Sequence, residues 1–141
     1  MSASKHKLYW RLQLAAHHLQ KHADRELSNK ANITTAQTGV LTVIANGSDV
    51  TQKDVALALG LNESAVTAMV KRLIALKYIR RRQCTHDRRT RILSLTDHGR
   101  EIQRNVRPPF RKINQKIEQT LSQEEIDCLA GYLARLTESF E

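Results

Sequence analysis

The stretch VTQKDVALALGLNESAVTAMVKRL, residues 50–73, decides the fold of this chain. Thr51 and Asp54 form a capping pattern that predicts the start of a short helix, and Gly60 suits the left-handed residue that ends it. Asn62 predicts the N-cap of a longer helix that follows. Two helices joined by a tight turn that contains a glycine are typical of a helix-turn-helix.

Three positions in this stretch fit the packing of a helix-turn-helix. Ala56 is small enough for the second helix to cross over it, Gly60 occupies the turn, and Val66 fills the space between the two helices. Many helical hairpins contain a glycine, so the segment that follows is needed to identify the motif.

That segment predicts a wing. The runs YIRRRQC (78–84) and TRILSL (90–95) alternate in the manner of strands, and the polar residues THDRR (85–89) join them. We therefore predict a β-hairpin with a five-residue tip. A helix-turn-helix followed directly by a hairpin is a winged helix.

Two amphipathic helices are predicted before the helix-turn-helix. Apolar residues recur at helical spacing from Leu8 to Leu27, and Thr34 with Gln37 forms a capping box that begins a second helix. Four apolar residues of this second helix share one face: Ala36, Val40, Leu41 and Ile44.

Two further helices are predicted after the hairpin. Thr96 caps the first, whose apolar stripe continues past Pro108-Pro109, so we expect one kinked helix or two nearly collinear ones. Ser122 with Glu125 begins the last helix. The predicted fold is mainly α with a small β-hairpin wing, in the order α-α-α-α-β-β-α-α. The long apolar seams of the terminal helices predict a homodimer.

Positive charge is concentrated in one part of the chain. The 141 residues carry a formal net charge of +9, and residues 71–91 contain nine Lys or Arg with a single acid, Asp87. A charge that served only solubility would be spread along the chain. A basic patch of this size indicates a polyanionic partner such as nucleic acid.

The composition argues against several other classes of protein. With 40% apolar residues, a chain of this length is expected to form one ordinary domain. Cys84 and Cys128 form no metal-binding or disulfide pattern, and no catalytic motif is present, so we expect no metal, no cofactor and no enzymatic activity. We find no signal peptide and no apolar run long enough for a membrane span, and we expect a cytoplasmic protein without a membrane partner.

Three stretches of the chain resemble the multiple-antibiotic-resistance regulator (MarR) family of bacterial transcription factors. They are ITTAQTGVL (33–41), the helix-turn-helix stretch (50–73) and DRRTRILSLTDHGREI (87–102). The last is the most specific, because it combines an Asp-x-Arg tip, a strand that ends in Leu-Thr, and a glycine three residues after that threonine.

The resemblance implies a homodimeric winged helix that covers residues 1–141 as a single domain of the family. Its parts are a DNA-binding lobe at 33–97, with the helix-turn-helix at about 51–76 and the wing at about 78–96, and dimerisation helices at 1–30 and 98–141. Lys77 departs from the family, which usually has glycine at the end of this helix. We expect Lys77 to be left-handed, or the helix to end differently.

The second helix of the motif is expected to enter the major groove, where side chains distinguish base pairs. Because its apolar residues face the core, Ser64, Thr67, Ala68 and Lys71 should point outward. Short hydroxyls and a methyl group suit a close approach to bases. Lys71 and Arg72 suit phosphate or guanine.

The tip of the wing is expected to reach the flanking minor groove. Arg89, the arginine of the Asp-x-Arg motif, suits a narrow groove, and Arg88 suits phosphate. Asp87 would hold the tip through a salt bridge and backbone hydrogen bonds. Arg80 and Arg82 lie on the face opposite Arg81, and their role stays open. The full set of predicted DNA-binding residues is Ser64, Thr67, Ala68, Lys71, Arg72, Arg88, Arg89 and Arg91.

The predicted function is sequence-specific regulation of transcription through double-stranded DNA, as a ligand-responsive repressor that binds a palindromic operator as a homodimer. Three aromatic residues could contact a small aromatic effector, although each also suits a core: Tyr9, Trp10 and Phe110. One alternative is a redox- or metal-responsive regulator of the same fold, which would use Cys84, Cys128, His17, His18 or His22. The other is a basic module that binds RNA or protein.

Overall fold

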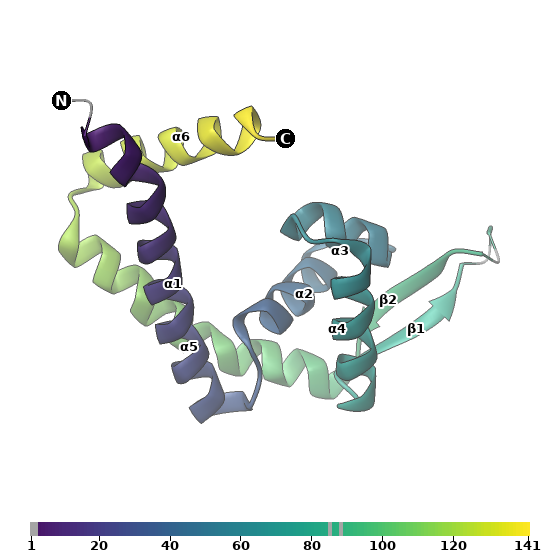
Figure 1. Ribbon diagram of the computed structural model, residues 1–141. Coiled ribbons are helices and arrows are strands. Elements are labelled where there is room, and N and C mark those ends of the chain that lie inside the picture. The colour runs from purple at the N-terminus through teal and green to yellow at the C-terminus, as the bar shows by residue number, and fades with distance from the viewer. Residues whose placement is uncertain (1–2, 85, 88) are drawn as a thin grey trace. The chain divides into compact units, whose positions relative to one another are not determined.

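The computed structural model describes residues 3–84, 86–87 and 89–141. Its elements, in order, are α1 (Ala3–Ala31), α2 (Thr35–Asn46), α3 (Gln52–Leu59), α4 (Glu63–Ala75), β1 (Ile79–Gln83), β2 (Arg91–Leu95), α5 (Asp97–Thr120) and α6 (Gln123–Ser139). The predicted mainly α fold with a β-hairpin wing between α4 and α5 is confirmed (Figure 1). The chain forms two compact units, Met1–Arg107 and Pro108–Glu141, and the first contains the whole winged helix.

Reciprocal capping boxes begin three of the helices, as predicted: Thr34 with Gln37, Thr51 with Asp54, and Ser122 with Glu125. In the first box, Thr34 Oγ1 accepts the Gln37 N–H at 3.2 Å, and Gln37 Oε1 accepts the Thr34 N–H at 3.1 Å. Each box provides partners for two backbone donors that a helix N-terminus would otherwise leave unpaired. These helix boundaries are therefore set by residues three positions apart.

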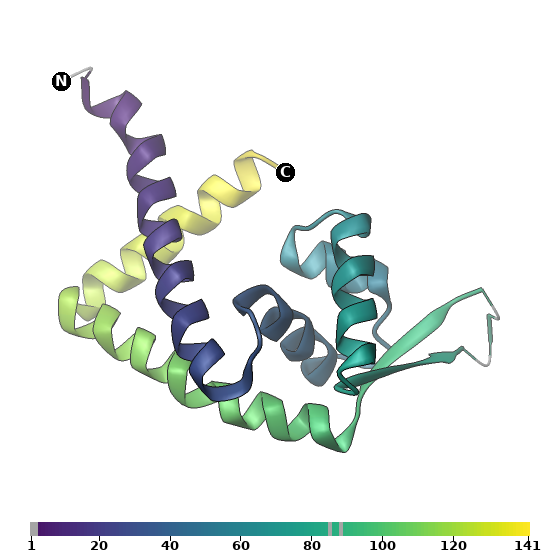
Figure 2. The same ribbon diagram turned by 60° about the horizontal axis from the view of Figure 1, so that its bottom comes forward.

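The core of the first unit lies among α2, α3 and α4, which contact one another pairwise (Figures 1 and 2). Its fully buried residues on these helices are Val40, Leu41, Val55, Val66, Val70 and Leu73. Of the four apolar residues that share one face of α2, Ala36 alone is exposed, and Gln37 is buried instead. The Gln37 side chain bends back to cap Thr34, so it lies along the start of α2 and does not extend into solvent.

The wing is a two-stranded antiparallel sheet in which Ile79 is opposite Leu95 and Gln83 is opposite Arg91. The strands are shorter than predicted, but Cys84 N–H donates to Thr90 O at 2.9 Å and extends the pairing toward the tip. Val50, before α3, pairs with Leu93 on the other side of β2. The helix-turn-helix and the wing therefore share backbone hydrogen bonds.

Lys77 ends α4 in the left-handed conformation, with φ of 64°. The Lys77 N–H donates to Ile74 O and the Tyr78 N–H to Leu73 O, both at 2.9 Å. These two bonds define a Schellman motif, in which glycine is the usual left-handed residue. Of the two outcomes expected for this position, a left-handed Lys77 or a helix that ends differently, the structure has the left-handed Lys77.

Thr96 connects the start of α5 to the end of α4. Its Oγ1 donates to Lys77 O at 2.6 Å and accepts the Gly99 N–H at 2.9 Å. The structure has one helix, α5, that continues through Pro108 and Pro109. The division between the two compact units falls immediately before these prolines.

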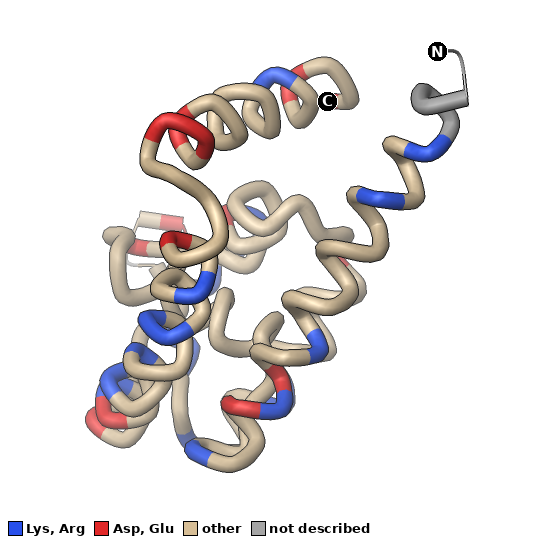
Figure 3. The backbone as a smooth tube through the Cα atoms, turned by 90° about the vertical axis from the view of Figure 1, so that its left-hand side faces the viewer, with Lys and Arg blue, Asp and Glu red and all other residues tan. Residues whose placement is uncertain are grey.

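The terminal helices carry much apolar surface that the single chain leaves exposed. In α1, Ala23 and Leu27 are buried, but the large apolar residues from Leu8 to Leu19 are exposed. No residue of α6 is buried. Figure 3 shows basic residues along α5 and acidic residues at the start of α6. Among the described residues, no helix is both long enough and apolar enough to cross a membrane.

Candidate nucleic-acid interface

The outer face of α4 carries the short and basic residues that were predicted to point outward. Ser64, Ala68, Lys71 and Arg72 are exposed, and Thr67 is half-buried. The opposite face of the helix is held in the core by Val66, Val70 and Leu73, as described above. Since only one face of α4 is buried, the other is free to contact a partner.

Both hydroxyl groups on this face are hydrogen-bonded within the protein. Ser64 Oγ donates to Asn62 Oδ1 at 2.8 Å, and Thr67 Oγ1 donates to Glu63 O at 2.8 Å. Thr67 Oγ1 also accepts a hydrogen bond from Gln52 Nε2 at 3.1 Å. Gln52, the first residue of α3, therefore links the two helices of the motif at their outer surface.

The tip of the wing is organised around Asp87. Its Oδ1 accepts the Arg89 N–H at 2.9 Å and its Oδ2 accepts the Thr90 hydroxyl at 3.0 Å, while its carbonyl accepts the Thr90 N–H at 3.1 Å. Within the described residues Asp87 makes hydrogen bonds only, and the expected salt bridge is not found. The Arg89 side chain is exposed, and Arg88 lies outside the described residues.

The arginines of β1 lie on two faces of the hairpin. Residues directly opposite each other in an antiparallel pair point to the same side, so Arg81 shares a face with Leu93 and Arg91. Arg82 lies on the other face and forms an ion pair with Asp49 at 3.0 Å. Arg82 therefore links the wing to the turn before α3, while Arg81 and Arg91 are exposed and make no ion pair with any residue that the structure describes.

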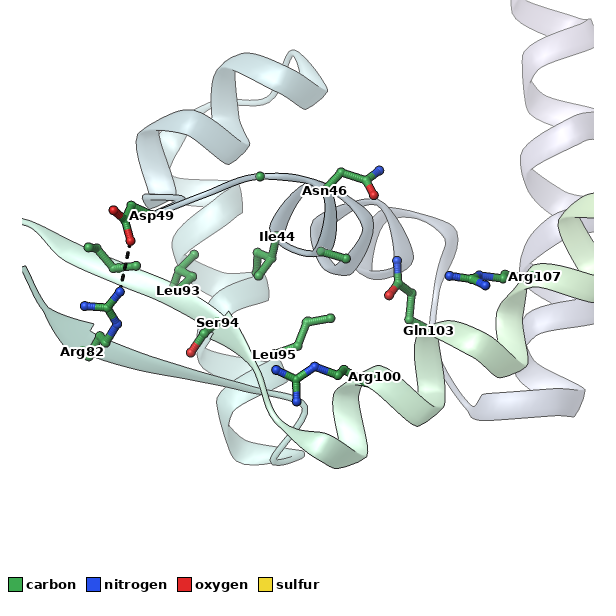
Figure 4. A pocket seen from close by; sticks show the side chains of 13 residues that line it. Ile44, Asn46, Asp49, Arg82, Leu93, Ser94, Leu95, Arg100, Gln103 and Arg107 are labelled. Atoms are coloured by element: carbon green, nitrogen blue, oxygen red, sulfur yellow. Dashed lines mark hydrogen bonds and ion pairs between the residues drawn. The ribbon is translucent and has the colours of Figure 1, made fainter.

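A pocket of about 440 Å³ lies beside this ion pair, between the end of α2, the wing and the first part of α5 (Figure 4). Arg100, Gln103 and Arg107 line it from successive turns of α5, and Ile44, Leu93 and Leu95 form an apolar wall. Arg100 is paired with Asp97 at 2.8 Å. Among the described residues Arg107 has no ion pair, so its charge is available to a ligand.

The other candidate groups are not gathered into a site. His17 and His18 are exposed, and no group of three or more His, Cys, Asp or Glu among the described residues could hold a metal ion. Cys84 is half-buried and Cys128 is exposed, and both are free thiols.

The aromatic residues of α1 are not core residues of the single chain. Tyr9 is 59% exposed and Trp10 is 70% exposed. Their rings pack edge to face, with the ring centroids 5.0 Å apart. Both therefore belong to the exposed apolar surface of the helix.

The sequence did not predict a role for Gln52, Asp49 or the α5 residues of the pocket. Gln52 follows the capping residue of α3, and its position on the outer side of the motif could have indicated a contact with α4. The pairing of Asp49 with Arg82 spans 33 positions and had no signal in the sequence.

A helix-turn-helix joined to a two-stranded wing, with basic residues exposed on both, is a winged helix with the basic surface typical of DNA-binding proteins. Residues 31–90 match the model of the MarR family. The HTH-type transcriptional regulator MgrA of Staphylococcus aureus is 28% identical over 145 residues, which cover 99% of this chain and 96% of MgrA.

Two solved structures of DNA complexes have the same fold. The S. aureus MepR–DNA complex matches with a TM-score of 0.86 and 26% identity, covering 93% of this chain and 96% of the MepR chain. Sco3205, a MarR family transcriptional regulator from Streptomyces coelicolor in complex with DNA, matches with a TM-score of 0.88 and 26% identity, covering 96% of this chain and 88% of its own. Residues 31–90 thus match the MarR family, and the chain as a whole is similar in sequence and fold to DNA-binding transcriptional regulators.

Proposed function

We propose that this protein represses transcription by binding a palindromic operator in duplex DNA as a homodimer. One observation carries the proposal: the exposed face of α4 and the tip of the wing belong to the same compact unit, and both carry basic residues. In this arrangement Ser64, Thr67 and Ala68 contact base edges in the major groove. Lys71 and Arg72, further along α4, contact phosphate or guanine.

The wing contributes the second contact. Arg89 enters the flanking minor groove, where a narrow A·T-rich segment concentrates negative potential. Arg88 and Arg91 contact phosphates. Asp87 accepts hydrogen bonds from both residues that follow Arg88, and it thereby holds the tip in shape while its own carboxylate is directed at the protein.

The proposed dimer uses the terminal helices, residues 1–30 and 98–141, and leaves residues 33–97 as the DNA-binding lobe. Exposed apolar side chains on α1 and α6 support this division, since a monomer rarely exposes large apolar patches. The exposed set includes Leu8, Trp10 and Leu14 of α1 and Leu129, Leu133, Leu136 and Phe140 of α6. Analytical ultracentrifugation should give twice the chain mass. A regulator of this kind acts on DNA in the cytoplasm.

The proposed ligand response involves the pocket beside the Arg82–Asp49 ion pair. Its lining carries three arginines and one carboxylate, and Arg107 has no ion pair among the described residues, so the pocket suits a small anion. The wall formed by Ile44, Leu93 and Leu95 suits an aromatic or other apolar body. A ligand here would contact the wing and α5 together, and it could release DNA only by binding one arrangement of them more tightly than the other.

Selection of random duplex DNA by the purified protein tests the DNA-binding proposal. We expect an inverted repeat with half-sites about one helical turn apart. The affinity should fall steeply with salt, with a log–log slope of about −0.9 per neutralised phosphate. Arg89→Ala should weaken binding, and Arg135→Ala on α6 is the matched control. Recovery of no common motif contradicts sequence-specific binding and favours an RNA- or protein-binding module.

A further inference from the structure

The N-terminal half of α4 offers few hydrogen-bond donors to DNA. Asn62 Oδ1 accepts the Ala65 N–H at 2.8 Å, which identifies that atom as the amide oxygen. Ser64 Oγ lies 2.8 Å from the same oxygen. Because an amide oxygen carries no hydrogen, the hydroxyl of Ser64 must donate its only proton to Asn62. Toward DNA, Ser64 can then act only as an acceptor.

Thr67 is restricted in the same way. Its hydroxyl proton is directed at Glu63 O, and one of its two lone pairs accepts the hydrogen bond from Gln52 Nε2. The two bonds select one χ1 rotamer of this β-branched side chain. What Thr67 can then offer a base is its methyl group and one remaining lone pair.

The neighbouring side chains continue this pattern. Ala68 is exposed and adds a second methyl group, and the exposed Glu63 carries only acceptor oxygens. The nearest donors on the helix are Lys71 and Arg72, about one turn further along. The side chains of the first two turns of α4 therefore present methyl groups and acceptors, and the nearest side-chain donor before them is the amide nitrogen of the N-cap, Asn62.

We propose that this half of α4 recognises A·T base pairs, with thymine methyl groups against Thr67 and Ala68 and the adenine amino group donating to Ser64 or Thr67. In the major groove only A·T presents an amino donor and a methyl group on the same pair. Guanine presents N7 and O6, two acceptors that would face acceptors and methyl groups and lose their hydrogen bonds to water. The inference rests on the proposed function, because it requires α4 in the major groove.

Gln52 is a positioning residue in this scheme. Its side chain acts on DNA through Thr67, by holding the threonine in the rotamer whose hydroxyl is directed at the protein. Replacement of Gln52 by Met keeps the length of the side chain and removes the donor. We expect Gln52→Met to reduce the discrimination of thymine from uracil, a readout that a purely structural role would leave unchanged.

The test replaces each thymine of the selected operator in turn by uracil, which lacks the methyl group. At one or two positions of each half-site the affinity should fall roughly fourfold, the effect of one buried methyl group. A G·C pair at the same positions should cost about tenfold or more. Thr67→Ser keeps both hydrogen bonds and should abolish the thymine–uracil difference at one position, whereas Thr67→Val should retain it. Thr42→Ser is the matched control, because Thr42 makes the same bond to the fourth preceding carbonyl on α2.

The outcomes separate this inference from the function on which it rests. Suppose that an inverted repeat is recovered, but that uracil can replace every thymine without loss of affinity, or that a G·C pair at those positions leaves the affinity unchanged. The A·T inference is then wrong, and the proposal of a DNA-binding regulator stands. If no operator is recovered, both are wrong.

Discussion

Gly99, in the first turn of α5, lies directly against the carbonyl oxygen of Tyr78, and a Cβ atom at position 99 would overlap that oxygen. The Thr96 N–H donates to the same carbonyl at 3.0 Å. The contact thus joins the start of α5 to the start of the wing. Gly99 does not have a positive φ, so glycine is required here for space and not for conformational freedom.

We therefore expect Gly99→Ala to lower the free energy of unfolding by about 2–4 kcal/mol, because backbone must move to admit one methyl group. Gly131→Ala is the matched control, since nothing lies within 4 Å of a Cβ at that position of α6. In a helix interior this change should raise the free energy of unfolding by about 1 kcal/mol. Denaturant titration measures both variants. Equal effects would show that the Tyr78 contact does not matter.

Lys77→Gly should stabilise the protein. The left-handed conformation of Lys77 strains an L-residue with a side chain, and glycine relieves that strain at the cost of a more flexible unfolded chain. The net gain should be about 0.5–1 kcal/mol, seen as a higher midpoint in thermal unfolding. Lys77→Ala is the control, because alanine must adopt the same strained conformation and should bring no such gain.

Asp87→Ala should weaken DNA binding even though it removes a negative charge from the wing. Its carboxylate holds the Arg89 N–H and the Thr90 hydroxyl, and loss of the two bonds should lower affinity by about fivefold to tenfold. Asp97→Ala removes an equal charge outside the tip and should leave affinity unchanged or slightly increased. Fluorescence anisotropy with the selected operator measures both. Tighter binding by Asp87→Ala would mean that charge, and not the shape of the tip, governs this segment.

The pocket beside α5 should bind benzoate more tightly than its neutral analogue benzamide. Arg107 supplies a positive charge without an ion pair among the described residues, and a ligand that binds the folded state raises the unfolding temperature. At equal concentrations, benzoate should raise the unfolding temperature more than benzamide does. Benzoate should also weaken binding of the operator. Arg107→Gln should remove the difference, and Arg135→Gln on α6 should retain it. Equal shifts from the two compounds would exclude an anion site.

Acid should destabilise the protein partly through two capping boxes. Hydrogen bonds from the Thr51 backbone and hydroxyl lower the pKa of Asp54 below its ordinary value of 3.8, and Ser122 lowers the pKa of Glu125 below 4.5 in the same way. A depressed folded-state pKa contributes stability above the unfolded value, and this stability is lost as the pH falls through the folded value. Asp54→Asn and Glu125→Gln should therefore be destabilising near neutral pH, and their difference from wild type should shrink below about pH 4. Thermal unfolding across this range measures the effect. A stability difference between variant and wild type that stays constant with pH would contradict this prediction.

The sequence by itself determined the features that depend on near neighbours. Capping boxes join residues three apart, and Gly60 needs only its own left-handed backbone, so both could be identified before any packing was known. The order of the elements, the hairpin and the basic segment from Lys71 to Arg91 follow from periodicity and charge in the same way. The outward direction of Ser64, Ala68 and Lys71 followed from helical spacing alone.

Only the tertiary structure decided the contacts between residues far apart in the chain. Gln52 reaches Thr67 across 15 positions and Asp49 reaches Arg82 across 33. Such pairs depend on how helices cross and how strands align, which no short window of sequence contains. The hydroxyls of α4 illustrate the difference. The sequence placed them at the surface, but only their hydrogen-bond partners in the fold show that their protons are directed at the protein, so that acceptors and methyl groups are what they leave exposed.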